Sequence, residues 1–306
     1  MHIKCETNGI ILASASAFAW GTAMVMSKAA LSAFPPIQLL AVQLAASCVA
    51  LWGWIALSTG ARGGLARAFR FSWLGLLEPG AAYFLGLTGL ADIEAGVAGL
   101  IQSSESLMIA ALAAIIMGER LPRRFILLAA LAFAGIVVAT MPPSGDAIGQ
   151  SLSGDALVLA GTGFAALYVI LSARYAGSID PVRLVAWQHL VALLLVLVSL
   201  PFAGSGEGMA SLRQIPLSVW VLAALSGVVQ YALAFSLYLA AMQRVSAGVA
   251  GAFINLIPVV GIAGGALFLD ESPSSLELVG AATTIAALVL LAQRSGGERP
   301  RILASD

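Results

Sequence analysis

The sequence is poor in charged residues. Only 10% of its 306 residues are Asp, Glu, Lys or Arg, whereas 60% are hydrophobic. A soluble domain carries roughly 25% charged and about 45–50% apolar residues, so this chain has too few polar groups to cover a water-exposed surface. Fifteen basic residues balance fifteen acidic ones, which excludes a broad basic surface for nucleic acid. The mean hydropathy of +0.98 predicts an all-α membrane protein with many spans.

Cysteine and histidine are also scarce. Cys5 precedes the first apolar run and Cys48 lies inside the second, so we expect two free thiols rather than a disulfide. The only histidines are His2 and His189, which leaves no credible metal site. The sequence contains neither the G-x-x-x-x-G-K-[ST] loop that binds ATP nor the H-E-x-x-H pattern of zinc proteases. We therefore expect no cofactor and no enzyme activity.

Long apolar runs fill most of the chain. A bilayer core needs about 20 mostly apolar residues per helix. The first run is too long for the apolar core of a signal peptide, so we interpret it as a membrane-spanning helix. The runs between charges and Pro/Gly breaks predict ten spans: 9–31, 36–58, 71–91, 95–117, 123–141, 153–175, 181–203, 214–242, 246–269 and 276–293. The loops between them leave no room for a soluble domain.

The fifteen Lys and Arg residues orient these spans. With a cytoplasmic N-terminus, thirteen of them fall on the cytoplasmic side, and only Lys28 and Arg213 fall outside. Because cytoplasmic loops are enriched in basic residues, this asymmetry predicts that both termini are cytoplasmic. We expect a multi-pass protein of the bacterial inner membrane.

The chain contains an internal repeat. Ala-Gly-Val-Ala-Gly at 95–99 recurs at 247–251, an offset of 152 residues, and an offset of 145 relates earlier positions. Three further pairs obey these offsets: Glu119 with Glu271, Gly75 with Gly227, and Gln43 with Gln188. The boundaries predict one half at 1–145 and a second at 146–306. Because five spans per half is an odd number, the second half must be inverted in the membrane, as in many secondary transporters.

The ends of the fourth and ninth spans resemble the EamA domain of the drug/metabolite transporter superfamily. They read Gly-Glu-Arg-Leu at 118–121 and Asp-Glu-Ser-Pro at 270–273, with Pro258 inside the ninth span. The first half departs from the pattern, since it has Ser106 opposite Pro258 and Glu105 in mid-span. The resemblance implies a central cavity lined by spans one, three, four, six, eight and nine, with five and ten at the periphery. It is strongest to the bacterial branch that exports aromatic amino acids and related metabolites.

Ionisable residues at membrane depth are functional candidates, because each costs some 2.5–3.5 kcal/mol at a helix centre. Glu105 shares a helix face with Gln102, and Glu78 lies beside a proline in the third span. Glu105 either titrates, holds a substrate ammonium or is a structural acid bonded to a neighbouring helix. For His189 we favour a structural role. Lys28 is either a charge at the outer mouth or a side chain that snorkels to the interface.

Aromatic and amide side chains at mid-depth form a second group. Such groups need a polar partner or a wet cavity, although an aromatic stripe on an apolar helix more often packs against lipid or protein. The predicted substrate-binding residues are Trp20, Glu78, Tyr83, Gln102, Glu105, Tyr168, Gln230, Tyr231, Tyr238 and Asn255.

Pro258 is predicted to be a gating hinge. A proline inside a helix removes a backbone hydrogen bond and can kink it, and its repeat partner Ser106 is expected to leave the fourth helix intact. The whole pattern predicts a monomeric secondary transporter that contacts lipid and exports neutral or aromatic amino acids and related metabolites. The alternatives are an efflux pump of other specificity and a membrane-embedded enzyme.

Overall fold

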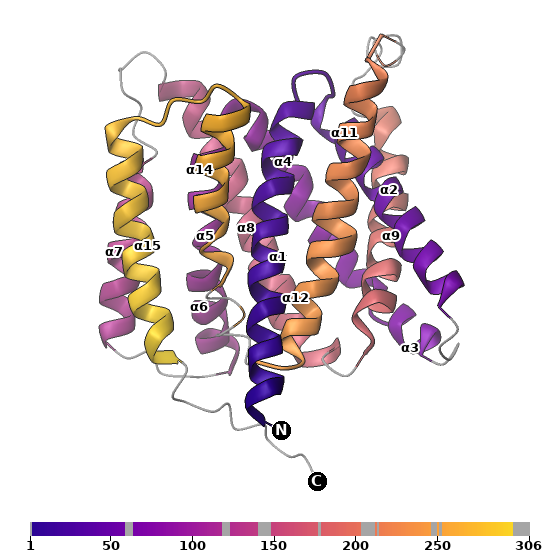
Figure 1. Ribbon diagram of the computed structural model, residues 1–306, viewed down its shortest axis with the longest axis horizontal. Coiled ribbons are helices and arrows are strands. Elements are labelled where there is room, and N and C mark those ends of the chain that lie inside the picture. Colours follow the sequence, from indigo (N-terminus) through magenta and orange to yellow (C-terminus); the bar gives the residue numbers. More distant parts are fainter. Residues whose placement is uncertain are drawn as a thin grey trace.

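The apolar runs of the sequence form helices (Figure 1). The computed structural model describes residues 2–58, 64–117, 123–139, 148–176, 179–202, 212, 214–245, 250 and 253–295. Every regular element within these ranges is helical, and they contain no strand. A helix satisfies its backbone hydrogen bonds internally, which is the requirement for crossing a bilayer.

The described part of the first half supplies seven α-helices, one 3₁₀ segment and one π-helical segment. These are α1 (His2–Ala30), α2 (Pro36–Leu57), α3 (Leu65–Phe69), the 3₁₀ turn η1 (Ser72–Leu76), the π-helical η2 (Leu77–Ala81), α4 (Ala82–Asp92), α5 (Ala95–Ser103), α6 (Glu105–Met117) and α7 (Arg123–Ala139). The second half follows the same plan. It comprises α8 (Ile148–Ala176), α9 (Pro181–Ser199), the 3₁₀ turn η4 (Leu200–Phe202), α11 (Leu217–Gly227), the π-helical η5 (Val228–Ala234), α12 (Phe235–Met242), α14 (Ile257–Phe268) and α15 (Ser275–Ser295).

Six helical stretches are long and apolar enough to cross a membrane. They are Thr7–Ala30, Pro36–Leu57, Ser72–Asp92, Leu152–Ser172, Pro181–Ser199 and Leu217–Met242. Three shorter apolar helices accompany them: Ile126–Ala139, Ile257–Phe268 and Ser275–Ala287. Large hydrophobic side chains such as Leu127 and Leu267 lie exposed on the outside of the bundle. Soluble proteins rarely expose so much apolar surface, so these faces contact lipid in a multi-pass membrane protein.

The fourth predicted span is broken near its middle. α5 ends at Ser103 and α6 begins at Glu105. The hydroxyls of Ser103 and Ser104 donate to the carbonyls of Leu100 and Ile101, at 2.6 Å each. Serine side chains that bond back to the preceding turn bend helices. The prediction that this helix is intact is therefore wrong.

Pro258 lies in the first turn of α14, not in the middle of a continuous helix. Residues 255–256 form a turn just before it. A proline at this position costs little, because first-turn amides have no intrahelical partner. Ser104 and the turn at 255–256 are related by the 152-residue offset, so both halves break at the same point of the repeat.

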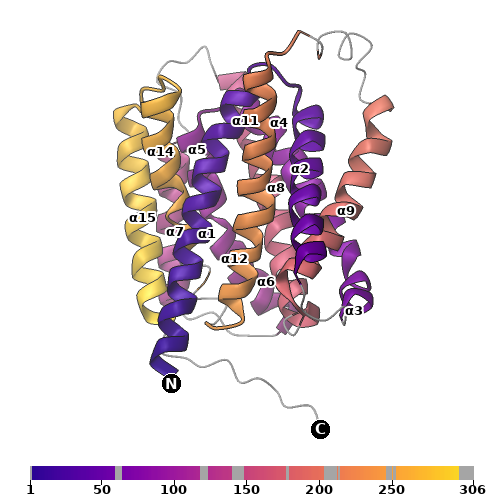
Figure 2. The same cartoon turned by 45° about the vertical axis from the view of Figure 1, so that its right-hand side comes forward.

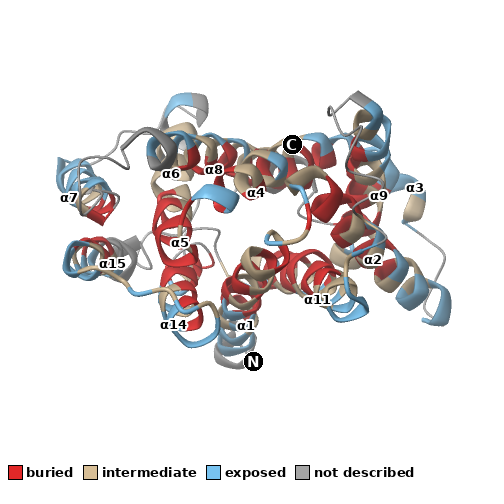
Figure 3. Cartoon of the chain, turned by 90° about the horizontal axis from the view of Figure 1, so that it is seen from above, coloured by how far each residue is buried: buried red, intermediate tan, exposed pale blue. Residues whose placement is uncertain are grey.

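The helices are arranged around a central group. In Figure 3, viewed from above, α1, α4, α5, α8, α11 and α14 surround the middle of the molecule. α7 and α15 pack on each other at one end, and α2 packs on α9 at the other. Figures 1 and 2 place the start of α1 and the end of α15 at the same face.

Close contacts recur between the two halves. A Cβ atom on Gly75 would overlap the backbone of Gln188, and a Cβ atom on Gly227 would overlap the backbone of Gln43. Gly75 and Gly227 are 152 residues apart, while Gln43 and Gln188 are 145 apart. These are the two offsets of the sequence repeat, so the repeated residues occupy equivalent places in the two halves.

A second pair of contacts obeys the same offsets. A Cβ atom on Gly9 would lie 2.6 Å from a methyl carbon of Val245, and one on Gly154 would lie 2.7 Å from a methyl carbon of Ile93. Gly9 and Gly154 differ by 145 residues, and Ile93 and Val245 differ by 152. The first helix of the first half thus contacts the end of the eighth predicted span, and the first helix of the second half contacts the end of the third.

Candidate functional site

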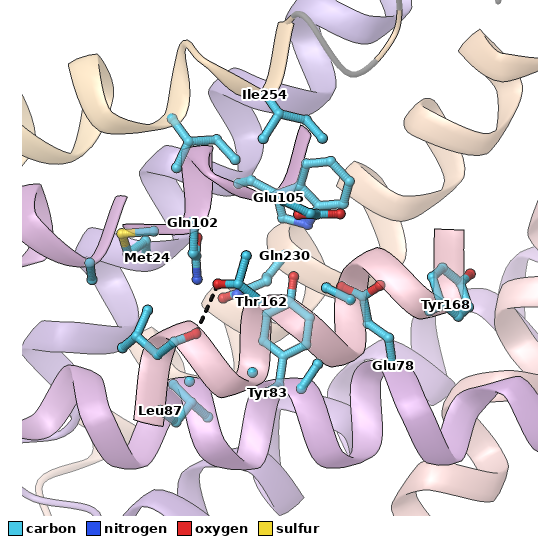
Figure 4. A pocket seen from close by; sticks show the side chains of 18 of the residues that line it. Met24, Glu78, Tyr83, Leu87, Gln102, Glu105, Thr162, Tyr168, Gln230 and Ile254 are labelled. Carbon is cyan, nitrogen blue, oxygen red and sulfur yellow. Dashed lines mark hydrogen bonds between the residues drawn. The ribbon is translucent and has the colours of Figure 1, made fainter. Parts of the chain in front are cut away.

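A cavity lies between the two halves of the chain and is lined by residues from both (Figure 4). It leaves about 60 Å³ for the centres of water-sized molecules, which is room for a handful of waters. Its walls come from α1, η2 with α4, α5 with α6, α8, η5 with α12, and the residues around the start of α14. Helices α2, α7, α9 and α15 contribute none of the described lining, which agrees with the arrangement that the sequence resemblance implies.

Most of the predicted substrate-binding residues meet at this cavity. Eight line it: Trp20, Glu78, Tyr83, Gln102, Glu105, Tyr168, Gln230 and Tyr238. Tyr231 and Asn255 do not. Polar groups predicted from separate helices are therefore brought together, as expected if water or a solute occupies the space between them.

Glu78 reaches the cavity from an irregular piece of backbone. Its φ of −143° and ψ of 123° are not helical, and Pro79 and Gly80 follow within η2. The proline removes one amide donor and disfavours helical geometry for the residue before it. The side chain is only 7% exposed and points into the cavity in Figure 4. Non-helical backbone at membrane depth is tolerated where it is buried in protein or lines a cavity.

Glu105 is the first residue of α6, directly after the break at Ser104. Its carboxyl group faces the cavity together with the side chain of Gln102, one turn earlier (Figure 4). This placement confirms that the two residues share a face. The amides of a helix N-terminus carry partial positive charge, so the break also provides a favourable local field for the Glu105 carboxylate.

Aromatic rings form one wall of the cavity. Trp20 packs against Phe235 and Tyr238, with ring centroids 5.3 and 5.2 Å apart. Tyr83 packs against Phe235 at 5.9 Å, and Tyr168 does so at 6.2 Å. Edge-to-face and tilted packing at these separations is favourable for aromatic pairs. The ring of Phe235, on α12, thus contacts rings from α1, α4 and α8.

Tyr231 lies behind this wall. Its ring packs on Tyr83, with centroids 4.7 Å apart, and its hydroxyl donates to Oε1 of Gln43 at 3.4 Å. Gln43 in turn donates from Nε2 to the hydroxyls of Ser27 and Ser226, at 2.8 Å each. A buried polar network with satisfied partners rigidifies its surroundings, so Tyr231 is placed to support the cavity and not to line it.

The same network reaches the cavity through Gln230. The Ser27 hydroxyl donates to Oε1 of Gln230 at 3.2 Å, and Gln230 is a lining residue. Gln188 plays a comparable part on α9, where its Oε1 accepts from the Tyr168 hydroxyl at 2.9 Å. Gln43 on α2, through Ser27, and Gln188 on α9 therefore connect helices outside the cavity to residues that line it. The repeat pairs these two residues but does not indicate this role.

His189 is fully buried and does not line the cavity. Its Nδ1 lies 2.9 Å from the Ser47 hydroxyl, and its ring packs edge-on against Tyr231 and Phe235. These contacts agree with the structural role favoured from the sequence. The unpartnered Oδ1 of Asn255 is likewise buried outside the cavity, next to the break before α14.

A separate charged cluster lies where α1 and α4 end and α5 begins. Lys28 donates from Nζ to the carbonyls of Leu90 and Ala91, at 2.9 and 3.1 Å. The Glu271 carboxylate accepts from the Ala95 backbone N–H at 3.1 and 3.2 Å, at the start of α5. Burial raises the pKa of Glu271 and of the neighbouring Glu94 above their usual range. Lys28 therefore ties α1 to α4 and is not a cavity residue.

Several lining residues were missed by the sequence reasoning. They include Met24, Gly86, Thr162 and Ala165. A Cβ atom on Gly86 would meet nothing within 4 Å, so this glycine opens part of the cavity. None of these side chains carries the charge or amide group that marks a residue as unusual at membrane depth. Within the described part of the chain, no group of three His, Cys, Asp or Glu residues is arranged to hold a metal ion.

Comparison with known proteins agrees with this architecture. The sequence model of the EamA-like transporter family matches the chain twice, over residues 7–141 and 152–293. A solved structure titled only "Crystal structure of protein" aligns with a TM-score of 0.69 and 20% sequence identity, covering 94% of this chain and 99% of that one. At this identity the likeness concerns the fold alone. No protein with curated function matches the sequence.

Proposed function

The chain belongs to the EamA-like transporter family, and from this premise we propose that it is a secondary transporter that exports small organic solutes across the bacterial inner membrane. Members of this family are transporters and not enzymes. The observation that carries the proposal is the cavity, which lies between the two halves and is lined by polar and aromatic residues from both.

We further propose ten spans, arranged as two inverted five-helix repeats with both termini in the cytoplasm. Helical segments occur in each of the ten predicted ranges, and the asymmetry of basic residues favours this orientation. The recurring contacts of Gly75 with Gln188 and of Gly227 with Gln43 support the repeat. An inverted repeat around a central site provides alternating access, because one half can rock against the other.

The solutes in this proposal are neutral or aromatic amino acids and related metabolites. The rings of Trp20, Tyr83 and Tyr168 offer stacking surfaces, and Gln102 and Gln230 offer amide donors and acceptors. The described lining residues include no cluster of Arg or Lys of the kind that binds phosphate groups. A drug or metabolite exporter of other specificity is the competing possibility, and a substrate panel separates the two.

The test is counterflow in proteoliposomes. Vesicles containing the purified protein are loaded with an unlabelled solute and diluted into the same solute carrying a radiolabel, with and without an imposed pH gradient. We expect transient accumulation of label for at least one amino acid or related metabolite. An enzyme would give no counterflow, and accumulation confined to unrelated drugs would exclude the proposed substrate class.

Gly86 supplies a matched pair of variants for this assay. A leucine at position 86 would extend into the cavity, whereas a leucine at Gly53, an exposed glycine on α2, would extend into open space outside it. We expect Gly86→Leu to abolish counterflow and Gly53→Leu to leave it unchanged, with both proteins inserted in equal amounts. Equal transport by the two variants would show that solutes do not pass through this cavity.

A further inference from the structure

Among the described residues that line the cavity, two carry acidic side chains and none carries a basic one. Glu78 and Glu105 both point into it (Figure 4). Its described lining includes no Lys, Arg or His, and the Lys28 ammonium is engaged by the carbonyls of Leu90 and Ala91 at the end of α4. An ionised carboxylate away from bulk water needs a cationic or hydrogen-bonding partner. The protein itself does not supply that cation among the lining residues.

A buried hydroxyl at the same cavity also lacks a partner among the described residues. The Tyr238 side chain is only 3% exposed and lines the cavity. Its hydroxyl makes no hydrogen bond within the part of the chain that the structure describes. A buried hydroxyl without a hydrogen-bond partner destabilises the folded protein. A phenol can donate one hydrogen bond and accept another, so this group points independently to a polar ligand, and its oxygen can accept from an ammonium N–H.

The rings around these groups suit a positive charge. Trp20, whose ring lies 5.2 Å from that of Tyr238, lines the cavity together with Tyr83 and Phe235. The faces of aromatic rings attract cations within about 6 Å, and Trp is the best of them. A cavity with two carboxylates and several rings therefore matches an organic ammonium group in both charge and shape.

We propose that the cavity binds the protonated amine of its solute, with Glu78 and Glu105 as its anionic partners and Tyr238 as a hydrogen-bond acceptor. The substrate class is then an organic amine that lacks a carboxylate, such as the amine corresponding to an aromatic amino acid. The relevance of this binding to export rests on the proposed function. It restricts the proposed solutes, which were amino acids and related metabolites, to the related amines.

A solute carboxylate fits the cavity poorly. It would approach Glu78 and Glu105, and like charges in a low-dielectric site repel strongly. Helix N-termini attract carboxylates in some transporters, but here the first residue of α6 is Glu105 itself. The first turn of α14 contains Pro258, which has no N–H to donate. The start of α14 therefore has one amide fewer to offer a solute carboxylate, and the start of α6 already places the Glu105 carboxyl group beside its own amides.

The two acidic groups come from one half of the molecule. The 152-residue offset places Gln230 opposite Glu78 and Ile257 opposite Glu105. Gln230 and Ile257 also line the cavity, so the second half presents an amide and an apolar side chain where the first presents carboxylates. The ammonium group is thereby held against the first half, while the aromatic wall is shared.

The proposal is tested by binding to the full-length protein in detergent micelles or nanodiscs at neutral pH. Equilibrium dialysis with radiolabelled phenethylamine measures the amine directly. Phenylalanine, 2-phenylethanol and 3-phenylpropionate serve as competitors, because they share the ring but differ in charge. We expect phenethylamine to bind at least about tenfold more tightly than phenylalanine or phenylethanol, a difference of about 1.4 kcal/mol, and 3-phenylpropionate not to compete.

Three variants complete the experiment. Glu78→Gln and Glu105→Gln keep the size of each side chain and remove its charge, so each should weaken phenethylamine binding about tenfold or more. Glu94→Gln is the matched control, since Glu94 is a half-buried acid that does not line this cavity; its affinity should be unchanged. If one of the cavity variants does not fold, the other variant and the competitor series still decide the question.

The outcomes separate this inference from the proposed function. Absence of saturable phenethylamine binding, tighter binding of phenylalanine, or unchanged affinity in both cavity variants would overturn the inference. Counterflow of phenylalanine without binding of the amine would leave the transport proposal standing and remove this one. Binding of the amine without counterflow of any solute would support the ammonium site and exclude the transport proposal.

Discussion

Glutamate can ionise and glutamine cannot, although the two side chains have nearly the same shape. At Glu105, where the carboxyl group faces the cavity from the start of α6, this difference separates charge from packing. We expect Glu105→Gln to insert and fold normally but to lose most transport, or to lose its response to pH. The measurement is counterflow between pH 5.5 and 8. Wild-type rates across this range would mean that Glu105 has only a structural role.

Polarity at membrane depth predicts most of the polar residues that line the cavity. The side chains of Glu78 and Gln102 are unfavourable in contact with lipid, which predicts that they face a cavity. Both line it. Tyr231 satisfied the same criterion but bonds to Gln43 behind the wall, because a buried polar network also removes polar groups from lipid. The sequence could not reveal Gly86, since a small residue that opens space looks the same as one that permits packing.

At the scale of helices, the two breaks deserve the closest test. Pro258 stands in the first turn of α14, directly after the turn at 255–256. Alanine at this position restores an amide that could extend α14 across the turn, so we expect Pro258→Ala to fold normally and to slow turnover. Pro181, in the first turn of α9, is a control outside the cavity. If both alanine variants transport at the wild-type rate, Pro258 does not act as a hinge.

The long apolar runs predicted where helices occur, but not where they are interrupted. Ser103 and Ser104 bond back to the preceding carbonyls, and whether serine does this or faces a neighbouring helix depends on tertiary contacts. The non-helical backbone at Glu78 had a clearer signal, because Pro79 follows it. The wide turn of η5 around Gln230 had none, since its sequence, Val228–Ala234, contains no proline or glycine.

The contact between Glu271 and α5 predicts a loss of stability on substitution. The Glu271 carboxylate accepts from the Ala95 N–H, an amide with no partner in its own helix. Glu271→Ala should lower the free energy of unfolding by about 1 kcal/mol, the typical value for a lost helix cap. Glu271→Gln should lower it by less, because the amide oxygen can still accept. Thermal unfolding in detergent measures both, and equal midpoints for wild type and alanine variant would contradict the assignment.

The same charged cluster predicts a dependence of stability on pH. Burial raises the pKa of Glu271 and Glu94 above the ordinary value of 4.5. The folded protein then keeps these protons to higher pH than the unfolded chain, so their contribution to the free energy of unfolding falls as pH rises above about 4.5. Thermal midpoints should therefore decline less steeply with pH in Glu94→Gln than in the wild type. A parallel decline would show that Glu94 does not contribute.

For the molecule as a whole, the proposed orientation gives the most direct test. The thirteen basic residues assigned to the cytoplasmic side require an even number of crossings between the termini. Reporter fusions after Asp306 and in the loop at 59–70 should read cytoplasmic, and a fusion near Asp146 should read periplasmic. A periplasmic C-terminus would exclude both the ten spans and the inverted repeat, while leaving membership of the EamA-like family untouched.

The paired contacts between the halves bear on how the protein is made. The surface around Gly75 is covered by α9, and that around Gly227 by α2. Because synthesis runs from the N-terminus, α2 and η1 enter the bilayer before α9 and α11 exist. Until the second half is inserted, the surfaces of α2 and η1 that it will cover stay exposed to lipid or to the insertion machinery. Glu78 and Glu105 are exposed in the same way. During this interval between insertion of the first and second halves, membrane proteases and chaperones have the greatest access to the chain.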